Sequence, residues 1–306
     1  MLRYLGRRLG QALVTILAVV SLAFVFGRLS GSPAVLLLGE NASSEQIAAL
    51  DAELGFDRPV WQQYLAYLAG VVRGDFGVSY RERGTSSMAL VLERLPFSLE
   101  LGFWGLGLGL LLAFAVVLTT HLTRWWPLRT VALALGSVRG SIPDFFFGLI
   151  LVIVFAVTLG WLPSLGAGHP LSLVMPALTI ATGQFIVYAR LLDNAISEQT
   201  GMDYVRTAQA RGEGRARTVL SEVLPNAVLP VMTVAGINLG AFLGGLVIVE
   251  NVFAWPGLGQ LMLGAVYARD FPVVQSGLIV IALLFIVANL LVDVGHSLID
   301  PRVRMR

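Results

Sequence analysis

The sequence predicts an all-α membrane protein with six transmembrane helices, a small helical cap on the outer side and a polar loop on the inner side. Three observations predict this class. Of the 306 residues 56% are hydrophobic, only 13% are charged, and six apolar runs are long enough to span a bilayer. Soluble proteins carry about twice that charged fraction, and a soluble core could not bury so much apolar surface.

Each run has about the 20 residues needed to cross about 30 Å of hydrocarbon. Continuous runs of this length form helices, because lipid offers no partner to an unpaired backbone group. The first run has a basic start, and we expect it to remain as an uncleaved anchor. The predicted spans are residues 9–26, 99–119, 143–160, 171–191, 231–249 and 277–298.

The arginines predict the orientation, because short cytoplasmic connections carry an excess of basic residues. The 160–170 connection has none. Arg139 is expected one turn outside the third span, at the cytoplasmic interface, since an arginine at the bilayer centre costs roughly 2.5–3.5 kcal/mol. The arginines assigned to the cytoplasmic side are Arg3, Arg7, Arg8, Arg124, Arg129, Arg206, Arg211, Arg215, Arg217, Arg302, Arg304 and Arg306.

This orientation divides the chain into three segments. Residues 1–29 form the tail and first helix, 30–98 an extracytoplasmic helical cap, and 99–306 a five-helix core with both chain ends and the loop at 192–229 in the cytoplasm. In the cap, Ser43 and Gln46 predict a capping box and Gly55 a helix end. A second helix is predicted between Pro59 and Gly74, with an inward apolar stripe of Trp61, Tyr64, Leu65, Leu68 and Val72.

Several kinds of chemistry are not supported by the sequence. The chain has no cysteine, and all 21 basic residues are arginine, so a lysine-containing phosphate-binding loop is excluded. His121, His169 and His296 share no metal-ligand spacing. The "GLGLG" at 105–109 lies inside a span and is interpreted as helix packing. We therefore expect no bound cofactor or metal and no enzymatic activity of the chain on its own.

Acidic residues within the spans are few. Glu100, Glu250 and Asp293 lie near predicted span ends, where interfacial anchoring or helix capping is favoured over a proton relay. Gly236, Gly240 and Gly244 repeat every four residues and predict a smooth helix-packing stripe. The same stripe is also compatible with a seam that slides during gating.

The stretch "YVRTAQARGEGRARTVLSEVLPNAVLP" at 204–230 is a polar, helix-forming segment between two apolar runs. Tyr204, Ala208 and Gly212 share one narrow helix face, and Arg206, Gln209 and Glu213 point the other way. Gly212 and Gly214 permit a sharp turn. A second short helix over about 215–224 is expected to end at Pro225, before Pro230 enters the fifth span. Such a pair of helices suits a partner's groove, and the alternative is a cationic surface on lipid head groups.

This segment resembles the cytoplasmic coupling loop of the membrane subunits of bacterial ATP-binding-cassette importers, at Arg206-Thr207-Ala208, Gly212 and Leu224-Pro225. The dipeptide, oligopeptide and nickel permease subgroup is similar over the whole chain. The similar blocks are "LGFDRPVWQQYLAYL" (54–68), "GDFGVS" (74–79), "RLPFSLEL" (94–101), "DYVRTAQARG" (203–212), "ENVFAWPGLGQLMLGAVYARDFPVVQ" (250–275) and "LVDVGHSLIDPRVR" (291–304). Ser32, Asp193 and Gln209 depart from the residues usual at these places.

The resemblance implies a multi-pass permease subunit of an ATP-driven importer in the bacterial cytoplasmic membrane. Its implied partners are a homologous second permease, two cytoplasmic ATPases that use ATP and magnesium, and an extracytoplasmic substrate-binding protein, with short peptides as the favoured substrate and nickel or another small solute as the alternative. An ATP-independent secondary transporter is the competing class. The implied ATPase-coupling residues are Tyr204, Val205, Arg206, Thr207, Ala208, Ala210, Arg211, Gly212, Leu224 and Pro225.

Overall fold

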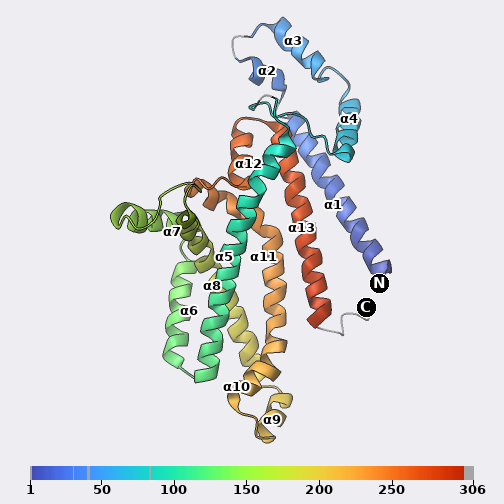
Figure 1. Cartoon of the computed structure of the whole chain (residues 1–306). Coiled ribbons are helices and arrows are strands. Elements are labelled where there is room, and N and C mark those ends of the chain that lie inside the picture. The colour runs from blue at the N-terminus through green and yellow to red at the C-terminus, as the bar shows by residue number, and fades with distance from the viewer. Residues whose placement is uncertain (1, 30, 40–41, 83, 300–306) are drawn as a thin grey trace. The chain divides into compact units, whose positions relative to one another are not determined.

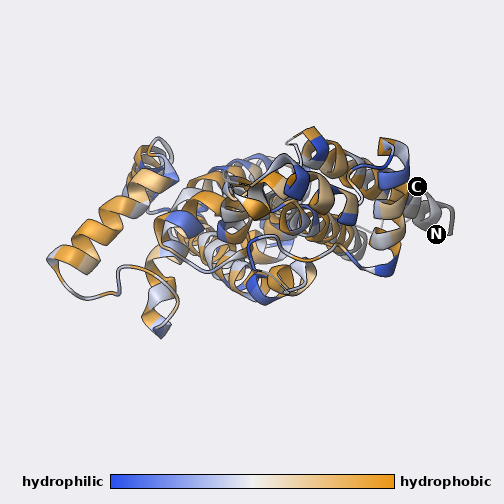
Figure 2. Ribbon diagram, turned by 90° about the horizontal axis from the view of Figure 1, so that it is seen from above, coloured by the Kyte–Doolittle hydropathy of each residue, from blue (hydrophilic) through white to orange (hydrophobic). Residues whose placement is uncertain are grey.

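The computed structural model describes residues 2–29, 31–39, 42–82 and 84–299, and these residues form helices and connecting loops without a named strand (Figure 1). Five helical stretches are long and apolar enough to cross a membrane, and a sixth span results if one sharply bent helix pair is counted as a single crossing. The all-α, polytopic fold class is therefore confirmed. Figure 2 shows hydrophobic residues on much of the ribbon, with hydrophilic residues in separate patches between them.

The chain packs as two compact units. One contains the described residues of 1–97 and 257–286, and the other those of 98–256 and 287–306. Helices α5 (Ser87–Thr123) and α13 (Phe271–Ile299) contribute to both units. The predicted functional division at residues 29 and 98 stays a prediction.

The first unit holds the predicted cap. It contains α1 (Leu2–Leu29), α2 (Pro33–Leu38), α3 (Ser44–Glu53), α4 (Val60–Arg73) and α12 (Leu258–Tyr267). The Ser43–Gln46 capping box is confirmed, and Gly74 ends α4 in the left-handed conformation. Ser32 accepts a hydrogen bond from the Ala34 N–H and donates one to Asp51, so this departure from the family pattern joins α2 to α3.

Helix α4 packs against α1, but with a different face from the one predicted. Tyr64 lies 2.6 Å from Ser21 through their hydroxyl oxygens, and its ring centroid is 5.2 Å from that of Phe24. The stripe prediction is right for Tyr64 and Leu68, and wrong for three others because α4 rolls Tyr67 and Val71 inward instead. The three outward residues are Trp61, Leu65 and Val72.

The second unit is built on α8 (Val174–Thr200) and α11 (Leu224–Val252), which pack against each other. Gly105 and Gly109 of α5 allow the close approach of α8, since a Cβ at either would come within 2.8 Å of Ile180 or Ala181. The helix-packing interpretation of "GLGLG" is thus confirmed.

The third span differs from its prediction. Helix α6 (Trp126–Gly140) packs along α8, whereas α7 (Asp144–Leu151) and the π-helical turn Val152–Thr158 are bent from it by 104°, and the two parts are long and apolar enough for a span only as a pair. Residues 143–160 therefore do not continue the direction of α6. The bend falls at Pro143, because the residue before a proline disfavours helical geometry.

The expected place of Arg139 at the cytoplasmic interface is also wrong. Arg139 is only 8% exposed, and its guanidinium donates to Thr182 Oγ1 at 2.9 Å and to the Thr179 carbonyl at 2.7 Å, well within α8. It also pairs with Asp144 at 2.7 Å and stacks over the Phe147 ring at 4.0 Å. The burial of this charge is offset by a full set of partners, which the sequence pattern does not display.

Candidate functional site

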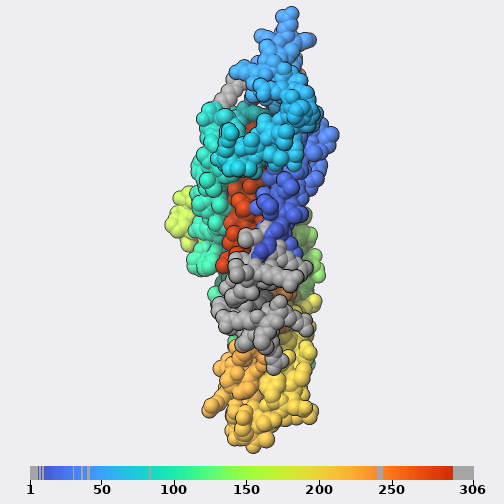
Figure 3. Space-filling model, turned by 90° about the vertical axis from the view of Figure 1, so that its right-hand side faces the viewer, coloured from blue at the N-terminus to red at the C-terminus, as the bar shows by residue number. Residues whose placement is uncertain are grey.

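The predicted coupling segment joins α8 to α11 at one end of the second unit. After Thr200 the chain turns into α9 (Asp203–Ala210), passes Gly212 and Gly214, and continues as α10 (Arg215–Arg217) and the π-helical turn Thr218–Val223 into α11. Figures 1 and 3 show this segment, yellow to orange, projecting at that end of the unit. Its two connections make it a direct link between two of the long helices.

One face of α9 is part of the unit's own core. Val205 and Ala208 are 1% and 0% exposed, and Val205 belongs to a buried cluster with Ile196, Val223 and Ala227. Tyr204 packs against this cluster, and its hydroxyl donates to Gln199 Oε1 at 2.7 Å. Ala208 is therefore buried within the unit, whereas Tyr204 is half-buried and its predicted contact with a partner stays a prediction. Val205 and Tyr204 pack α9 against residues of α8 and α11, so the apolar edge of this polar helix is covered.

The opposite edge of α9 faces outward and is cationic. The Arg206 guanidinium lies 3.5 Å from the Asp203 carboxylate, and both side chains are largely exposed. Arg211 lies 3.4 Å from Glu213 in a similarly loose pair. Exposed pairs of this kind contribute about 0–1 kcal/mol and leave the arginines available to another partner. The outward residues of this edge are Arg206, Thr207, Gln209, Ala210 and Arg211.

The glycine turn after α9 is confirmed at Gly212, whose φ is +84°. The Gly212 and Glu213 N–H groups donate to the Gln209 and Ala208 carbonyls at 2.9 and 3.2 Å and so close the helix end. A glycine suits this left-handed position because a Cβ there is strained. Gly214 has an ordinary extended conformation before α10, so only Gly212 is required by the backbone.

The second short helix does not end at Pro225 as predicted. Leu224 is half-buried and Pro225 lies in the first turn of α11, which then runs through Pro230 to Val252. The missing N–H of Pro225 is tolerated there, because the preceding π-helical turn resets the hydrogen-bond pattern and α11 begins again as a new helix. The residues after the glycine turn are thereby continuous with a long membrane helix.

A buried ion cluster that no sequence pattern predicted lies beneath this segment. Asp193 of α8 is 3% exposed and accepts from Arg129 Nε at 2.9 Å and Nη2 at 2.7 Å. His121 Nε2 lies 2.9 Å from the same carboxylate, and the His121 carbonyl accepts from Arg215 Nε at 2.6 Å. The cluster ties the ends of α5 and α6 to α8 and to the start of α10. Its sequence signal was an acid directly after an apolar run, which was noted only as a departure from the family pattern.

Other predicted residues are brought to separate places. Gly236 is buried, Gly244 is exposed with open space around it, and the packing of Gly240 lies outside the described residues. Glu250 is fully buried and accepts a hydrogen bond from Ser98 at 2.5 Å, so interfacial anchoring is wrong for it, while Glu100 is exposed. The side chains of Asp293 and His296 lie outside the described residues. Among the residues described, no group of three His, Cys, Asp or Glu side chains is arranged to hold a metal.

Comparison with known proteins gives matches along the whole length. Residues 100–305 match the family described as the binding-protein-dependent transport system inner membrane component, and residues 1–102 match the corresponding N-terminal family. The chain is 36% identical over 310 residues, covering 100% of both chains, to the glutathione transport system permease protein GsiC of Salmonella choleraesuis (strain SC-B67). It is 34% identical over the same length to GsiC of Escherichia coli (strain K12).

Two solved structures share the fold at lower identity. A structure of the MetNI methionine ABC transporter in an inward-facing conformation is 22% identical, with a TM-score of 0.58 over 70% of this chain and 97% of that chain. An amino acid ABC transporter is 19% identical, with a TM-score of 0.51 over 70% of this chain and 94% of that one.

Proposed function

Because the chain belongs to the family of binding-protein-dependent transport system inner membrane components, and is thus a membrane permease subunit of an ABC importer, we propose that it carries short peptides or peptide-like solutes across the membrane. The peptide class is supported by full-length relatives whose name states glutathione transport, since glutathione is itself a small peptide. The alternative is nickel import by the same machinery, and an uptake assay with both substrates decides between the two.

The observation that carries the coupling role is the two-sided construction of α9. Its inner face is fixed in the core by Val205 and Ala208, and its outer edge presents Arg206 and Arg211 with only loose partners. A partner that binds the outer edge and moves therefore displaces the whole of α9, including its buried face. Because α9 is joined to α8 on one side and, through Gly212, to α11 on the other, such a movement tilts both long helices.

The family of the chain supports the proposed partners. Two ATPase subunits hold α9 and the equivalent helix of a second, homologous permease, and they bind the ATP and magnesium. A substrate-binding protein delivers the solute from outside. This arrangement places both chain ends and α9 in the cytoplasm and residues 30–98 on the outer side of the bacterial cytoplasmic membrane. In the groove of the ATPase, Arg206 and Arg211 meet acidic groups, and Thr207 and Ala210 supply the close contact.

The substitution Gly212→Glu tests the coupling role. Among the described residues no atom lies within 4 Å of a Cβ at Gly212, so the new side chain meets only solvent or a partner. A side chain at φ +84° costs roughly 1–2 kcal/mol, which leaves the fold intact. We expect normal insertion and a loss of ATP-driven uptake of more than about ten-fold, a barrier increase above about 1.4 kcal/mol.

Gly212→Asn is the matched control, because asparagine tolerates the left-handed conformation and adds no charge. It is expected to keep most of the uptake and to cross-link to the ATPase as the unmodified chain does. Near-normal uptake by Gly212→Glu would remove the coupling assignment. Solute movement by the purified chain on an ion gradient, without ATPase, would instead establish a secondary transporter.

A further inference from the structure

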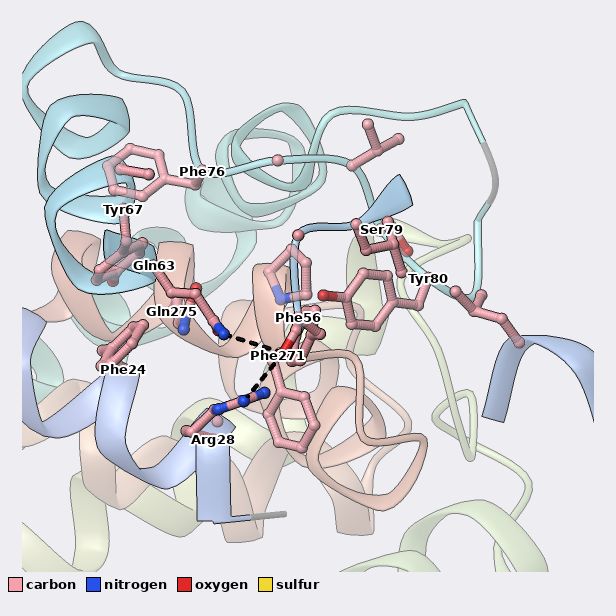
Figure 4. A pocket seen from close by; sticks show the side chains of 18 of the residues that line it. Phe24, Arg28, Phe56, Gln63, Tyr67, Phe76, Ser79, Tyr80, Phe271 and Gln275 are labelled. Atoms are coloured by element: carbon pink, nitrogen blue, oxygen red, sulfur yellow. Dashed lines mark hydrogen bonds between the residues drawn. The ribbon is translucent and has the colours of Figure 1, made fainter. Parts of the chain in front are cut away.

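The first unit contains a cavity of about 860 Å³ between the outer part of α1, the cap helices and the start of α13 (Figure 4). This volume lies within the range of small-molecule sites. Six aromatic rings line it, from Phe24, Phe56, Tyr67, Phe76, Tyr80 and Phe271. Pockets of this kind recognise a largely apolar body through ring contacts and fix it by a few polar groups.

The charge in this cavity has one sign. Arg28 and Arg58 line it, and none of the described lining residues is acidic. The Arg28 guanidinium donates to the Phe56 carbonyl at 3.2 Å and lies 5.0 Å from the centre of the Phe56 ring, without a carboxylate partner in the part of the chain that the structure describes. In Figure 4 its head group lies at the edge of the cavity, beneath Phe56. The cavity therefore favours an anion attached to an apolar body.

Two tyrosine rings line the cavity, and their hydroxyl groups differ. The Tyr67 hydroxyl is fully buried and makes no hydrogen bond among the described residues. Burial, and then the nearby Asp270 charge, raise the pKa of Tyr80 to about 12, so its hydroxyl remains a donor at neutral pH. The Tyr80 hydroxyl can therefore donate to an oxygen-rich group that enters the cavity.

The position of the cavity along two spans identifies the source of such a ligand. The first span is Gly10–Leu29 and the last begins at Phe271, and the cavity is lined by Gly27 and Arg28 of one and by Pro272 of the other. It thus lies where both helices leave the hydrocarbon. This is the depth of phospholipid head groups.

The outer face of α4 agrees with that depth. Tyr64 contacts Ser21, which precedes the end of the first span by about two turns or about 12 Å. On the far side of α4, Trp61, Leu65 and Val72 are 62%, 55% and 88% exposed. An exposed apolar stripe with a tryptophan at this depth is typical of a helix that lies in the membrane interface. The cavity on the other side of α4 is therefore next to lipid.

We propose that this cavity binds an anionic phospholipid, with its phosphate at Arg28 and Arg58 and part of an acyl chain among the aromatic rings. The bound lipid fills the space between α1, α4 and α13 and joins the cap to the two membrane helices. This goes beyond the transport function, because it assigns the cap a ligand from the bilayer rather than from the imported solutes.

Lipid titration tests the proposal directly. Acyl-labelled phosphatidylglycerol is added to the full-length chain, purified with its co-purifying subunits, and labelled phosphatidylcholine is compared with it. Each arginine near a bilayer surface contributes about five-fold to the affinity for an anionic lipid. Arg28→Gln combined with Arg58→Gln is therefore expected to lower the affinity for phosphatidylglycerol by about 30-fold, while Arg28→Lys retains most of it.

Arg73→Gln is the matched control, because Arg73 is an exposed arginine at the end of α4 that does not line the cavity. It is expected to bind as the unmodified chain does. Ala66→Trp adds bulk to the lining of the cavity and leaves both arginines in the sequence, and it is expected to abolish the high-affinity site. This variant keeps the test decisive if the arginine variants fold poorly.

Four results would overturn the proposal. Equal affinity for phosphatidylcholine and phosphatidylglycerol would remove the anion preference. Displacement by inorganic phosphate alone would make the cavity a site for free anions, and displacement by glutathione or a dipeptide would make it a site for the imported solute. Unchanged binding in both the Arg28/Arg58 and the Ala66 variants would place the lipid elsewhere.

Discussion

Helix α9 and the bend between α6 and α7 both use arginine, and they use it in opposite ways. Arg139 at the bend is 8% exposed and donates to two oxygens of α8 and to Asp144. Arg206 on α9 is largely exposed and has one loose partner in Asp203. A buried arginine with a complete set of partners holds a structure together, whereas exposed arginines on a helix whose other face is fixed form a surface for another molecule.

Among the substitutions that test this comparison, removal of the buried arginine is expected to lower the stability of the protein most. Arg139→Met leaves the Thr179 carbonyl and Asp144 without their donor, and breaking a buried pair costs about 3–5 kcal/mol. We expect poor yield of folded protein and a marked fall in thermal stability in detergent, measured by size-exclusion chromatography after heating.

Asp144→Asn is the informative counterpart, since the Asp144 side chain is 54% exposed and its loss is partly compensated by water. Asp144→Asn is expected to lower the free energy of unfolding by less than about 1 kcal/mol. Equal stability of Arg139→Met and the unmodified chain would show that the bend is held by packing alone.

The bend also marks a limit of what the sequence could predict. Five or six apolar spans could be predicted from run lengths and a helix break at Pro143 from the proline itself, because both are local properties. The depth of Arg139 did not follow, because its partners Thr179 and Thr182 are distant in sequence and have no pattern of their own. The 104° angle between α6 and α7 did not follow either, because a proline marks the place of a break and not its angle.

Loss of the buried carboxylate beneath α9 is expected to have the next largest effect. Asp193→Ala leaves His121 and Arg129 without their shared acceptor, and an unpaired buried polar or charged group costs about 2–3 kcal/mol. Since the His121 carbonyl also accepts from Arg215, residues 203–217 are expected to become more mobile. Hydrogen exchange in this segment measures the change. Unaltered exchange would show that the ion cluster does not hold α9 in place.

The candidate site was predictable in place but not in orientation. The polar stretch at 204–217 and the turn at Gly212 follow from composition and from the glycine itself. The inward face of α9 does not, because Val205 is buried only in the cluster that residues of α8 and α11 complete. An eight-residue helix has too few apolar residues for its periodicity alone to identify the buried side.

Two alanines that lie within one turn of α9, but on different faces, sharpen the comparison. Ala208→Leu adds volume to a fully buried position, and overpacking there is expected to cost about 1–2 kcal/mol. Ala210→Leu places the same side chain on the exposed edge and is expected to leave stability unchanged. Thermal unfolding of the two variants gives the comparison, and a larger loss for Ala210→Leu would reverse the assignment of the two faces.

The smallest expected effect on stability belongs to the exposed arginine. Arg206→Ala removes one loose surface pair, so the free energy of unfolding is expected to change by less than about 0.5 kcal/mol. Its effect on uptake is expected to be large, because in the proposed coupling role this side chain meets the ATPase. Parallel measurement of thermal stability and ATP-driven uptake separates the two quantities. If Arg206→Ala lowers both together, the exposed edge of α9 serves the fold as Arg139 does, and the contrast between the two regions disappears.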